Sequence, residues 1–283
     1  MKYYIIIPAH NEELFLAKTL DSVVKQHHLP NKVIVVNDNS TDATESIIDD
    51  FVDKYSIFHK LNTTSSTLHM PGSKVVNAFN KGLKLLDTDY DFIVKLDADI
   101  ILPKNYFQKI TEIFKEHPKV GITGGFAYEQ EETGEWKLNH PMDKNHVRGA
   151  FKAYSKAYFM TTGGLKSAMG WDTLDELLGQ YHGFEIFTDE TLKVKHLRPI
   201  GKAYNKKAKL LQGKAMYTMR YGFRITLIAS VKMALKQGKP RALLDNLKGY
   251  FKAKRDKEVF LVSPKEGRFI RKLRWMNMRK KLF

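Results

Sequence analysis

Five short stretches of the chain gather carboxylates, amides and imidazoles at spacings that could serve chemistry. They are PAHNEE at residues 8–13, DNSTD at 38–42, DAD at 97–99, GWDTLDEL at 170–177 and the histidine of LKVKHLRP. The 283 residues include no cysteine, so any catalytic metal must be held by carboxylates or histidine. The chemistry open to these stretches is therefore that of a carboxylate-held metal ion or of a carboxylate base.

The elements that must position these stretches alternate between strands and helices. Apolar, β-rich runs predict strands at 3–7, 32–37 and 91–96. Amphipathic patterns predict helices over Leu16, Leu20, Val23 and Val24, from a cap at Ser40 or Thr41 to Phe51, over 73–86, and from Pro103 through Phe114. This order predicts an α/β fold with a mostly parallel sheet and right-handed crossovers. Ligands of such sheets bind beyond the carboxyl ends of the strands, where the first three polar stretches fall.

Four motifs carry a family resemblance. They are PAHNEE at 8–13, VVNDNSTD at 35–42, GSKVVNAFNKG at 72–82 and KLDADI at 95–100. In their order and spacing the chain resembles family 2 of the glycosyltransferases over roughly residues 1–200. The resemblance implies the GT-A fold, a Rossmann-like α/β fold with a mostly parallel central sheet flanked by helices. It also implies an inverting, metal-dependent transfer of a sugar from a nucleoside diphosphate sugar, with UDP favoured.

The resemblance also implies a donor site. Asp38 would accept the imide N–H of uracil, although Asn37 stands where the family often has a second acid. Lys74, at the start of its helix, would meet the diphosphate or the ribose. The wall beside the base would be formed by Pro8, Ala9, His10, Asn11 and Glu12. Simple helix capping by residues 38–40 and a solvated Lys74 are the alternatives.

A departing nucleoside diphosphate develops charge that must be neutralised, and Mg²⁺ or Mn²⁺ does this. Asp99 resembles the family's direct metal ligand, while Asp97 would lie nearer the ribose or complete the metal shell. His196 stands at the end of a predicted strand, where many GT-A enzymes have a histidine that completes this shell. The alternatives are that His196 is a structural histidine and that DAD is merely a polar strand end.

An inverting transfer requires a base close to the acceptor hydroxyl, and family members usually carry it in an acidic motif at a helix start. The corresponding stretch here is GWDTLDEL. Counting back from Gly183 places Asp172 where the base usually stands, although Trp171 replaces the first acid of the common Glu-Asp pair. Asp175 and Glu176 remain alternatives. Asp172 could instead be an N-cap, with Asp175 at the third helical position.

Composition predicts a folded body with a basic appendage. Hydrophobic residues make up 43% of the chain, which favours a buried core over disorder. The net charge of +16 is uneven: from residue 201 onward there are 24 Lys and Arg against 4 Asp and Glu, whereas residues 1–200 have 23 against 27. A boundary near Gly201 is therefore predicted between a GT-A catalytic domain (1–200) and a basic amphipathic helical extension (201–283).

The extension predicts an anionic membrane surface as a partner. Its helical stretch 215–235 is too short and too charged to span a bilayer. Trp275, Phe269 and Phe283 supply an apolar face of the kind that amphipathic helices bury at a membrane interface, among bases that anionic lipids attract. A solvated basic cap on the catalytic domain is the alternative.

These features also predict a location and an acceptor. The start MKYYIIIPAHNEE lacks the long apolar stretch of a signal peptide, so a cytoplasmic enzyme is expected, peripheral on the inner face of the membrane. Its acceptor would be a glycan or lipid-linked glycan of the cell envelope. A non-enzymatic polyanion or nucleic-acid binder would leave the motifs idle, and no nucleic acid is expected as a partner. A sugar nucleotidyltransferase, the other alternative, would usually show a Gly-rich phosphate loop near its first strand.

Overall fold

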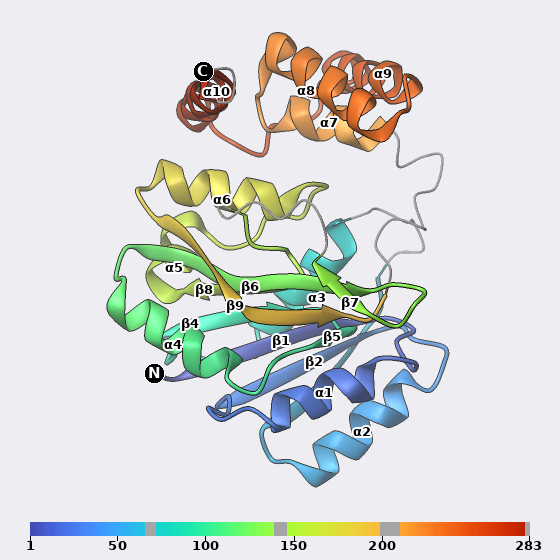
Figure 1. Cartoon of the computed structure of the whole chain (residues 1–283), viewed down its shortest axis with the longest axis vertical. Helices are drawn as coiled ribbons and strands as arrows, with labels where there is room; N and C mark the ends of the chain where they lie inside the picture. The colour runs from blue at the N-terminus through green and yellow to red at the C-terminus, as the bar shows by residue number, and fades with distance from the viewer. Residues whose placement is uncertain (66–71, 139–145, 199–209, 281–283) are drawn as a thin grey trace. The chain divides into compact units, whose positions relative to one another are not determined.

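The chain divides into two compact units in the computed structural model (Figure 1), which describes residues 1–65, 72–138, 146–198 and 210–280. The first unit comprises Met1–His69, Lys74–Leu165 and His182–Ile200, and the second Met70–Ser73, Lys166–Tyr181 and Gly201–Phe283. The domain boundary predicted near Gly201 lies in the segment 199–209, outside the described residues, and stays a prediction.

A central sheet organises the first unit. Its described strands are β1 (Tyr3–Ala9), β2 (Lys32–Asp38), β3 (Phe58–Thr63), β4 (Phe92–Leu96), β5 (Ile100–Ile101), β6 (Val120–Gln130), β7 (Trp136–Leu138), β8 (Phe151–Ser155) and β9 (Glu185–His196). They lie in the order β3-β2-β1-β4-β8-β6-β9-β5, with β7 paired to β6. β1 is parallel to β2 and β4, β2 to β3, and β6 to β9, while β8 runs antiparallel to its neighbours. The predicted mostly parallel sheet is confirmed.

Helices cover both faces of this sheet. They are α1 (Leu16–Val24), α2 (Thr44–Lys54), α3 (Ser73–Leu83), α4 (Tyr106–Glu116) and α5 (Lys156–Thr162). Figure 1 shows α1, α2 and α4 on one face and α3 and α5 on the other. Strands covered on both faces must be apolar on both, which explains the unbroken apolar runs of β1, β2 and β4. Tyr3 of β1 stacks on Phe92 of β4 with ring centroids 4.6 Å apart and lies 4.9 Å from Phe107 of α4, joining sheet to helix.

The start of α2 differs from the prediction. The helix begins at Thr44, and neither Ser40 nor Thr41 caps it, because Oδ1 of Asp42 accepts the Thr44 N–H over 3.0 Å. Ser40 Oγ instead accepts the backbone N–H of Asn11 over 3.1 Å, and the Thr41 N–H donates to Asn11 Oδ1 over 2.8 Å. The residues predicted to cap the helix therefore tie two loops together.

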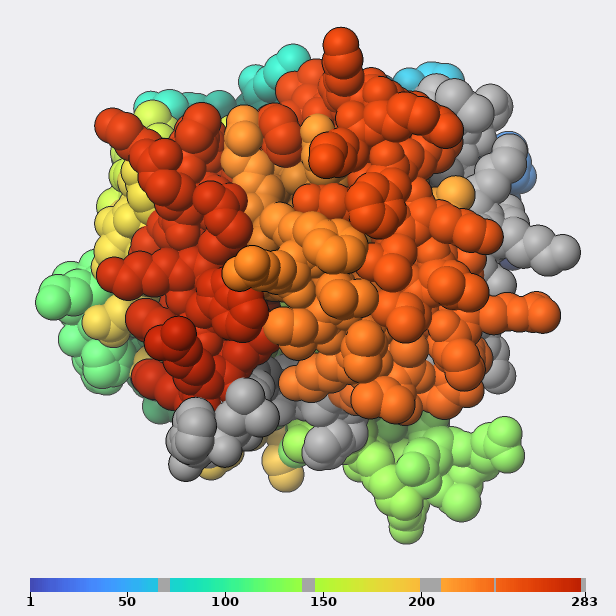
Figure 2. All heavy atoms as spheres, turned by 90° about the horizontal axis from the view of Figure 1, so that it is seen from above, coloured from blue at the N-terminus to red at the C-terminus, as the bar shows by residue number. Residues whose placement is uncertain are grey.

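The second unit is helical. Its elements are α6 (Trp171–Tyr181), α7 (Leu211–Thr218), α8 (Gly222–Gln237), α9 (Arg241–Arg255) and α10 (Pro264–Arg279). The stretch 215–235, predicted as one helix, is broken between α7 and α8, where Arg220 takes a left-handed conformation with φ of 55°. Figure 2 shows side chains of α8, α9 and α10 on one face of this unit. Among the described residues no helix is both long and apolar enough to cross a membrane.

Candidate active site

The loops that follow β1 and β2 are joined by hydrogen bonds. The Glu12 N–H donates to Thr44 Oγ1 over 2.7 Å, and Glu13 accepts the Ala43 N–H over 3.0 Å. Nδ1 of His10 lies 2.7 Å from the backbone oxygen of Asp38, so this nitrogen carries the proton and donates it. These bonds fix residues 10–13, which follow Pro8 and Ala9 at the end of β1, against the end of β2.

Asp38 ends β2 and is buried. Its Oδ1 has no hydrogen-bond partner among the described residues. Since buried polar atoms are nearly always paired, this oxygen fits a ligand N–H donor. The neighbouring Asn37 serves the loop itself: its Nδ2 donates to Asn62 Oδ1 over 3.0 Å, and its Oδ1 accepts the Ser40 N–H over 3.3 Å. An amide can both donate and accept, which a second acid at this position could not do.

A buried threonine fixes the turn that carries Asp97 and Asp99. Thr19 of α1 donates to the Ala98 carbonyl over 2.7 Å and accepts the Ile100 N–H over 3.0 Å. The short strand β5 that follows pairs with β9, with Ile100 opposite His196. This pairing brings the strand end of β9 beside the DAD turn.

Asp99 and His196 consequently lie together. Nε2 of His196 is 3.4 Å from Oδ1 of Asp99, and each side chain is only 11% exposed. The same Oδ1 and the His196 Nδ1 have no hydrogen-bond partner among the described residues. The structure thus brings together the two residues predicted to share a metal, while their role stays a prediction.

Sequence reasoning missed Arg198, which joins this pair to the β1 loop. Its Nη2 lies 2.5 Å from Oε2 of Glu12, and its Nε lies 3.6 Å from Oδ2 of Asp99. The signal was present in the sequence, because Arg198 follows His196 by two residues in KHLRP. An arginine so close to a candidate metal ligand places a fixed positive charge between two acids.

Burial and charge act in opposite directions on these acids. Burial raises the pKa of Glu12 to about 7; the nearby Asp99 and Asp97 raise it further, while Arg198 opposes the rise. Burial also raises the pKa of Asp99, but His196, Arg198 and Lys95 together outweigh it, so that pKa is lowered. Asp99 is therefore held as a carboxylate, the form that binds a metal.

Lys95 was also missed. The side chain of this β4 lysine is buried, only 2% exposed. It forms an ion pair with Asp97, whose side chain is 31% exposed. Asp97 thus faces an ammonium group rather than lying free for a cation. In the described part of the chain no three histidine or acidic side chains cluster as a metal cage, so a metal at Asp99 and His196 would need further oxygen ligands.

The remaining predicted residues lie elsewhere. Lys74 is the second residue of α3 and half-buried. Asp172 lies in the first turn of α6 rather than at its N-cap, because the helix begins at Trp171, so the capping alternative is wrong. Asp175 and Glu176 are buried on the same helix, and Asp175 Oδ1 accepts the Glu176 N–H over 2.6 Å. These acids belong to the second unit, whereas the cluster around Asp99 belongs to the first.

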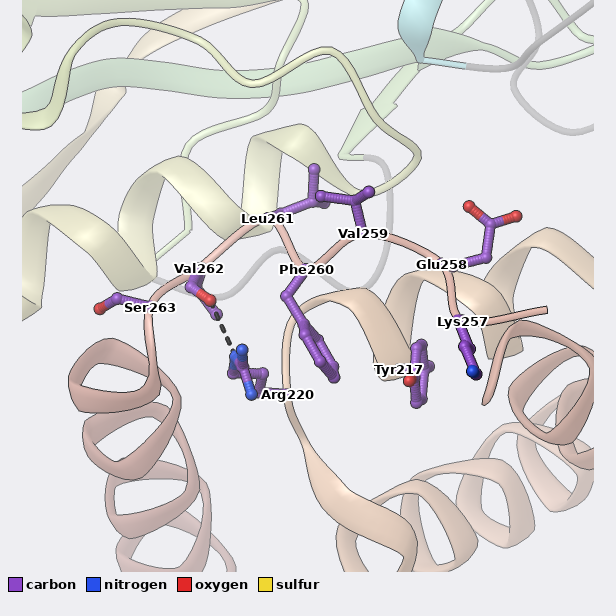
Figure 3. Close-up of a pocket in the computed structure, with 9 residues that line it drawn as sticks. All are labelled: Tyr217, Arg220, Lys257, Glu258, Val259, Phe260, Leu261, Val262 and Ser263. Atoms are coloured by element: carbon purple, nitrogen blue, oxygen red, sulfur yellow. Dashed lines mark hydrogen bonds between the residues drawn. The ribbon is translucent and has the colours of Figure 1, made fainter. Parts of the chain in front are cut away.

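The second unit also contains a hollow of about 670 Å³ lined by Tyr217, Arg220 and residues 257–263 (Figure 3). Arg220, one of its charged residues, is already engaged: its guanidinium lies 3.5 Å from the centroid of the Phe260 ring, and its Nε donates to the Val262 carbonyl over 2.8 Å. None of the residues predicted for catalysis or donor binding lines this hollow.

Solved structures identify the architecture. Residues 1–349 of TarS from S. aureus, in complex with UDP-GlcNAc, are similar with a TM-score of 0.56 and 18% identity, covering 76% of this chain and 67% of that one. The mannosyltransferase PcManGT from Pyrobaculum calidifontis, in complex with GDP-Man and Mn²⁺, is similar with a TM-score of 0.58 and 15% identity, covering 100% and 81%. At these identities the likeness concerns the fold, and it confirms the predicted GT-A fold.

Sequence comparison gives the family. Residues 4–169 match the family described as Glycosyl transferase family 2, and the chain belongs to this family. Poly-beta-1,6-N-acetyl-D-glucosamine synthase of Staphylococcus epidermidis is 29% identical over 121 residues, which are 42% of this chain and 27% of that protein. An uncharacterized glycosyltransferase of Mycoplasma genitalium is 26% identical over 178 residues, 59% of this chain and 57% of that protein. The matched part thus spans between about a quarter and just over half of these two relatives.

Proposed function

We propose that this glycosyltransferase transfers a sugar from a UDP sugar to a glycan or lipid-linked glycan of the cell envelope, by an inverting, metal-dependent displacement. The observation that supports this most directly is the buried pair of Asp99 and His196, 3.4 Å apart, each with a polar atom that has no hydrogen-bond partner in the described part of the chain. Their position beyond the carboxyl ends of the strands is where ligands of such sheets bind.

The residues fit a divalent metal. A carboxylate and an imidazole are suitable ligands for Mn²⁺, and Mg²⁺ is commonly held by one or two carboxylates plus substrate phosphates. When bound, such an ion would stabilise the charge that develops on the departing diphosphate. Arg198 would keep Asp99 ionised, and Lys95 would hold Asp97 toward the ribose or the edge of the metal shell. The Mn²⁺ bound to PcManGT supports the choice of metal.

The donor base would lie against the joined loops. Asp38 would accept the imide N–H of uracil through Oδ1, which no described residue engages, and residues 8–12 would form the wall beside the ring. Lys74 would approach the diphosphate from the first turn of α3, where the helix N-terminus also favours an anion. The UDP-GlcNAc bound to TarS supports a UDP sugar, whereas the GDP-Man bound to PcManGT makes GDP-mannose the necessary comparison.

An acid of α6 would act as the base that takes the proton of the acceptor hydroxyl. Asp172 is the first choice because it is half-buried in the first helical turn, whereas Asp175 and Glu176 are buried. A cytoplasmic enzyme, peripheral on the inner face of the membrane, belongs to the same proposal, since the basic second unit would bring it to a lipid-linked acceptor.

The experiment is hydrolysis of a panel of nucleoside diphosphate sugars, with Mn²⁺, with Mg²⁺ and with chelator. We expect release of UDP from one UDP sugar, dependent on the metal and slower with GDP-mannose. Hydrolysis that chelator leaves unchanged would refute the metal assignment. A panel without any turnover, in a protein that melts cooperatively, would refute the transferase proposal.

A further inference from the structure

Two helices of the second unit present apolar side chains to solvent. Leu235 of α8 is 77% exposed, and Leu244 of α9 is 55% exposed. The complete set, called the α8–α9 apolar face below, consists of Phe223, Ile228, Val231, Leu235, Leu244 and Phe251.

These side chains cannot turn inward on α9, because its other face is packed closely against α7. A Cβ on Gly213 would lie 1.9 Å from the Asn246 carbonyl oxygen, and one on Gly249 would lie 2.0 Å from that of Leu210. The buried residues of α9 are Asn246, Gly249, Tyr250 and Ala253. At about 100° per residue, Leu244 and Phe251 fall on the opposite side of the helix.

The same separation holds on α8. Its buried residues include Ile225, Thr226, Ser230 and Ala234. Helical spacing places Val231 and Leu235, one turn apart, opposite that buried side. Val231 and Leu235 therefore point away from the buried side of α8, as Leu244 and Phe251 do on α9.

Exposed aromatic rings join the two helices. The rings of Phe223 at the start of α8 and Phe251 near the end of α9 lie 5.6 Å apart. Figure 2 shows side chains of both helices together on the same side of the unit. Several exposed apolar residues in one patch are more typical of a binding surface than of ordinary solvent-facing helices.

Basic residues surround this face. Between residues 222 and 256 there are nine Lys and Arg against two Asp. One of the two acids, Asp256, is already paired with Lys252 and Arg255. Five exposed bases form no ion pair with another described residue: Arg224, Lys232, Lys236, Arg241 and Lys248. The occupant of these helices must therefore offer both apolar groups and negative charge.

We infer that the α8–α9 apolar face lies on an anionic lipid surface, with its leucines and phenylalanines in the acyl region and its bases at the phosphates. A second copy of the protein would carry the same positive charge and be repelled. Nucleic acid would leave the exposed leucine and valine side chains without apolar contacts. This deepens the membrane part of the proposed function and rests on it.

The face differs from the one predicted from sequence. Phe269 of α10 was expected to meet the membrane, but its ring lies 5.5 Å from that of Tyr181 and it packs on the core of the second unit. Trp275 is 37% exposed, and Phe283 lies outside the described residues. The expectation for Phe269 is wrong, because α10 uses that side to join α6.

The test is sedimentation of the full chain with vesicles. Binding is measured to phosphatidylglycerol mixed with phosphatidylcholine, and to phosphatidylcholine alone. We expect binding to the anionic vesicles, weakened at least about tenfold by Leu235→Ser with Leu244→Ser. Arg241→Gln with Lys248→Gln should weaken it by roughly tenfold or more. The matched controls are Leu29→Ser with Leu85→Ser, whose leucines are each 51% exposed in the first unit, and they should bind like wild type.

Vesicle binding that the Leu235 and Leu244 pair leaves unchanged would overturn the inference. So would tight binding to single-stranded RNA that ignores the leucines, which points to a polyanion, or self-association that the leucine pair abolishes, which points to a second copy. Donor hydrolysis is measured without vesicles on the same proteins. Normal hydrolysis without vesicle binding refutes the membrane face alone, whereas vesicle binding without hydrolysis of any donor refutes the sugar transfer alone.

Discussion

Arg198 donates from Nη2 to Oε2 of Glu12 over 2.5 Å, and this contact joins the end of β9 to the loop after β1. The same guanidinium reaches Asp99 through Nε over 3.6 Å. The positive charge of Arg198 thus lies close to both Glu12 and Asp99, and Asp99 is the candidate metal ligand. Glu12 is the more buried partner of its pair, with a side chain 13% exposed against 49% for Arg198.

The first prediction concerns Glu12 and pH. Its pKa in the folded protein is about 7, raised from 4.5 mainly by burial. At pH values between these two, Glu12 therefore binds a proton in the folded state that it has lost in the unfolded state. The stability that this proton contributes is fully present below the unfolded pKa and is lost as pH rises through about 7. Relative to Glu12→Gln, the wild-type free energy of unfolding should therefore fall by up to about 3 kcal/mol between pH ~4.5 and ~8.

Urea unfolding in chelator at several pH values measures this difference. The exposed Glu116→Gln serves as the matched control and should keep the wild-type dependence. A Glu12→Gln variant whose stability follows pH just as wild type does would contradict the assignment.

The second prediction concerns the buried Lys95. Lys95→Met keeps much of the side-chain volume but leaves Asp97 without its ammonium partner. The substitution should lower the free energy of unfolding by about 1 to 3 kcal/mol. This is less than the cost of removing one partner of a fully buried ion pair, because Asp97 is partly exposed to solvent. Adding Asp97→Asn should recover part of it. The exposed Lys115→Met should change stability by less than about 0.5 kcal/mol, and equal losses in both variants would refute the pairing argument.

Sequence reasoning reached the sheet through local pattern, whereas the pairing of Asp99 with His196 was implied by the family resemblance. Apolar runs that end in polar residues locate β1, β2 and β4, and topology then brings their carboxyl ends to one edge. It could not find the roles of Thr19 and Lys95, since each acts through contacts across the fold that no spacing reveals. The break near Arg220 was missed because the apolar pattern continues across it.

The third prediction concerns the metal. Asp99→Asn keeps the shape of the side chain but removes the charge that would hold the ion. Sugar transfer should fall by orders of magnitude, and raising Mn²⁺ should recover little of it. The melting temperature should stay near that of wild type, because the amide can still meet His196. Turnover close to wild type at ordinary Mn²⁺ concentration would rule out Asp99 as the metal ligand.

The last prediction concerns the base, for which three acids of α6 compete. Deprotonating the acceptor hydroxyl contributes about 10² to 10⁴ in rate, whereas an exposed or half-exposed polar substitution in a helix changes stability by only about 0.5 kcal/mol. Asp172→Asn keeps the size of the side chain and one acceptor oxygen but removes basicity. Transfer should therefore collapse while UDP-sugar affinity and melting temperature stay close to wild type.

Asp175→Asn and Glu176→Gln are the matched comparisons on the same helix. Both side chains are buried, so their substitution should lower the melting temperature as well as activity if they serve the packing of α6. Donor hydrolysis without acceptor is measured on the same variants, because it separates a loss of donor binding from a loss of transfer. Transfer that survives in Asp172→Asn but vanishes in Asp175→Asn or Glu176→Gln, with melting unchanged, would move the base to the later acid.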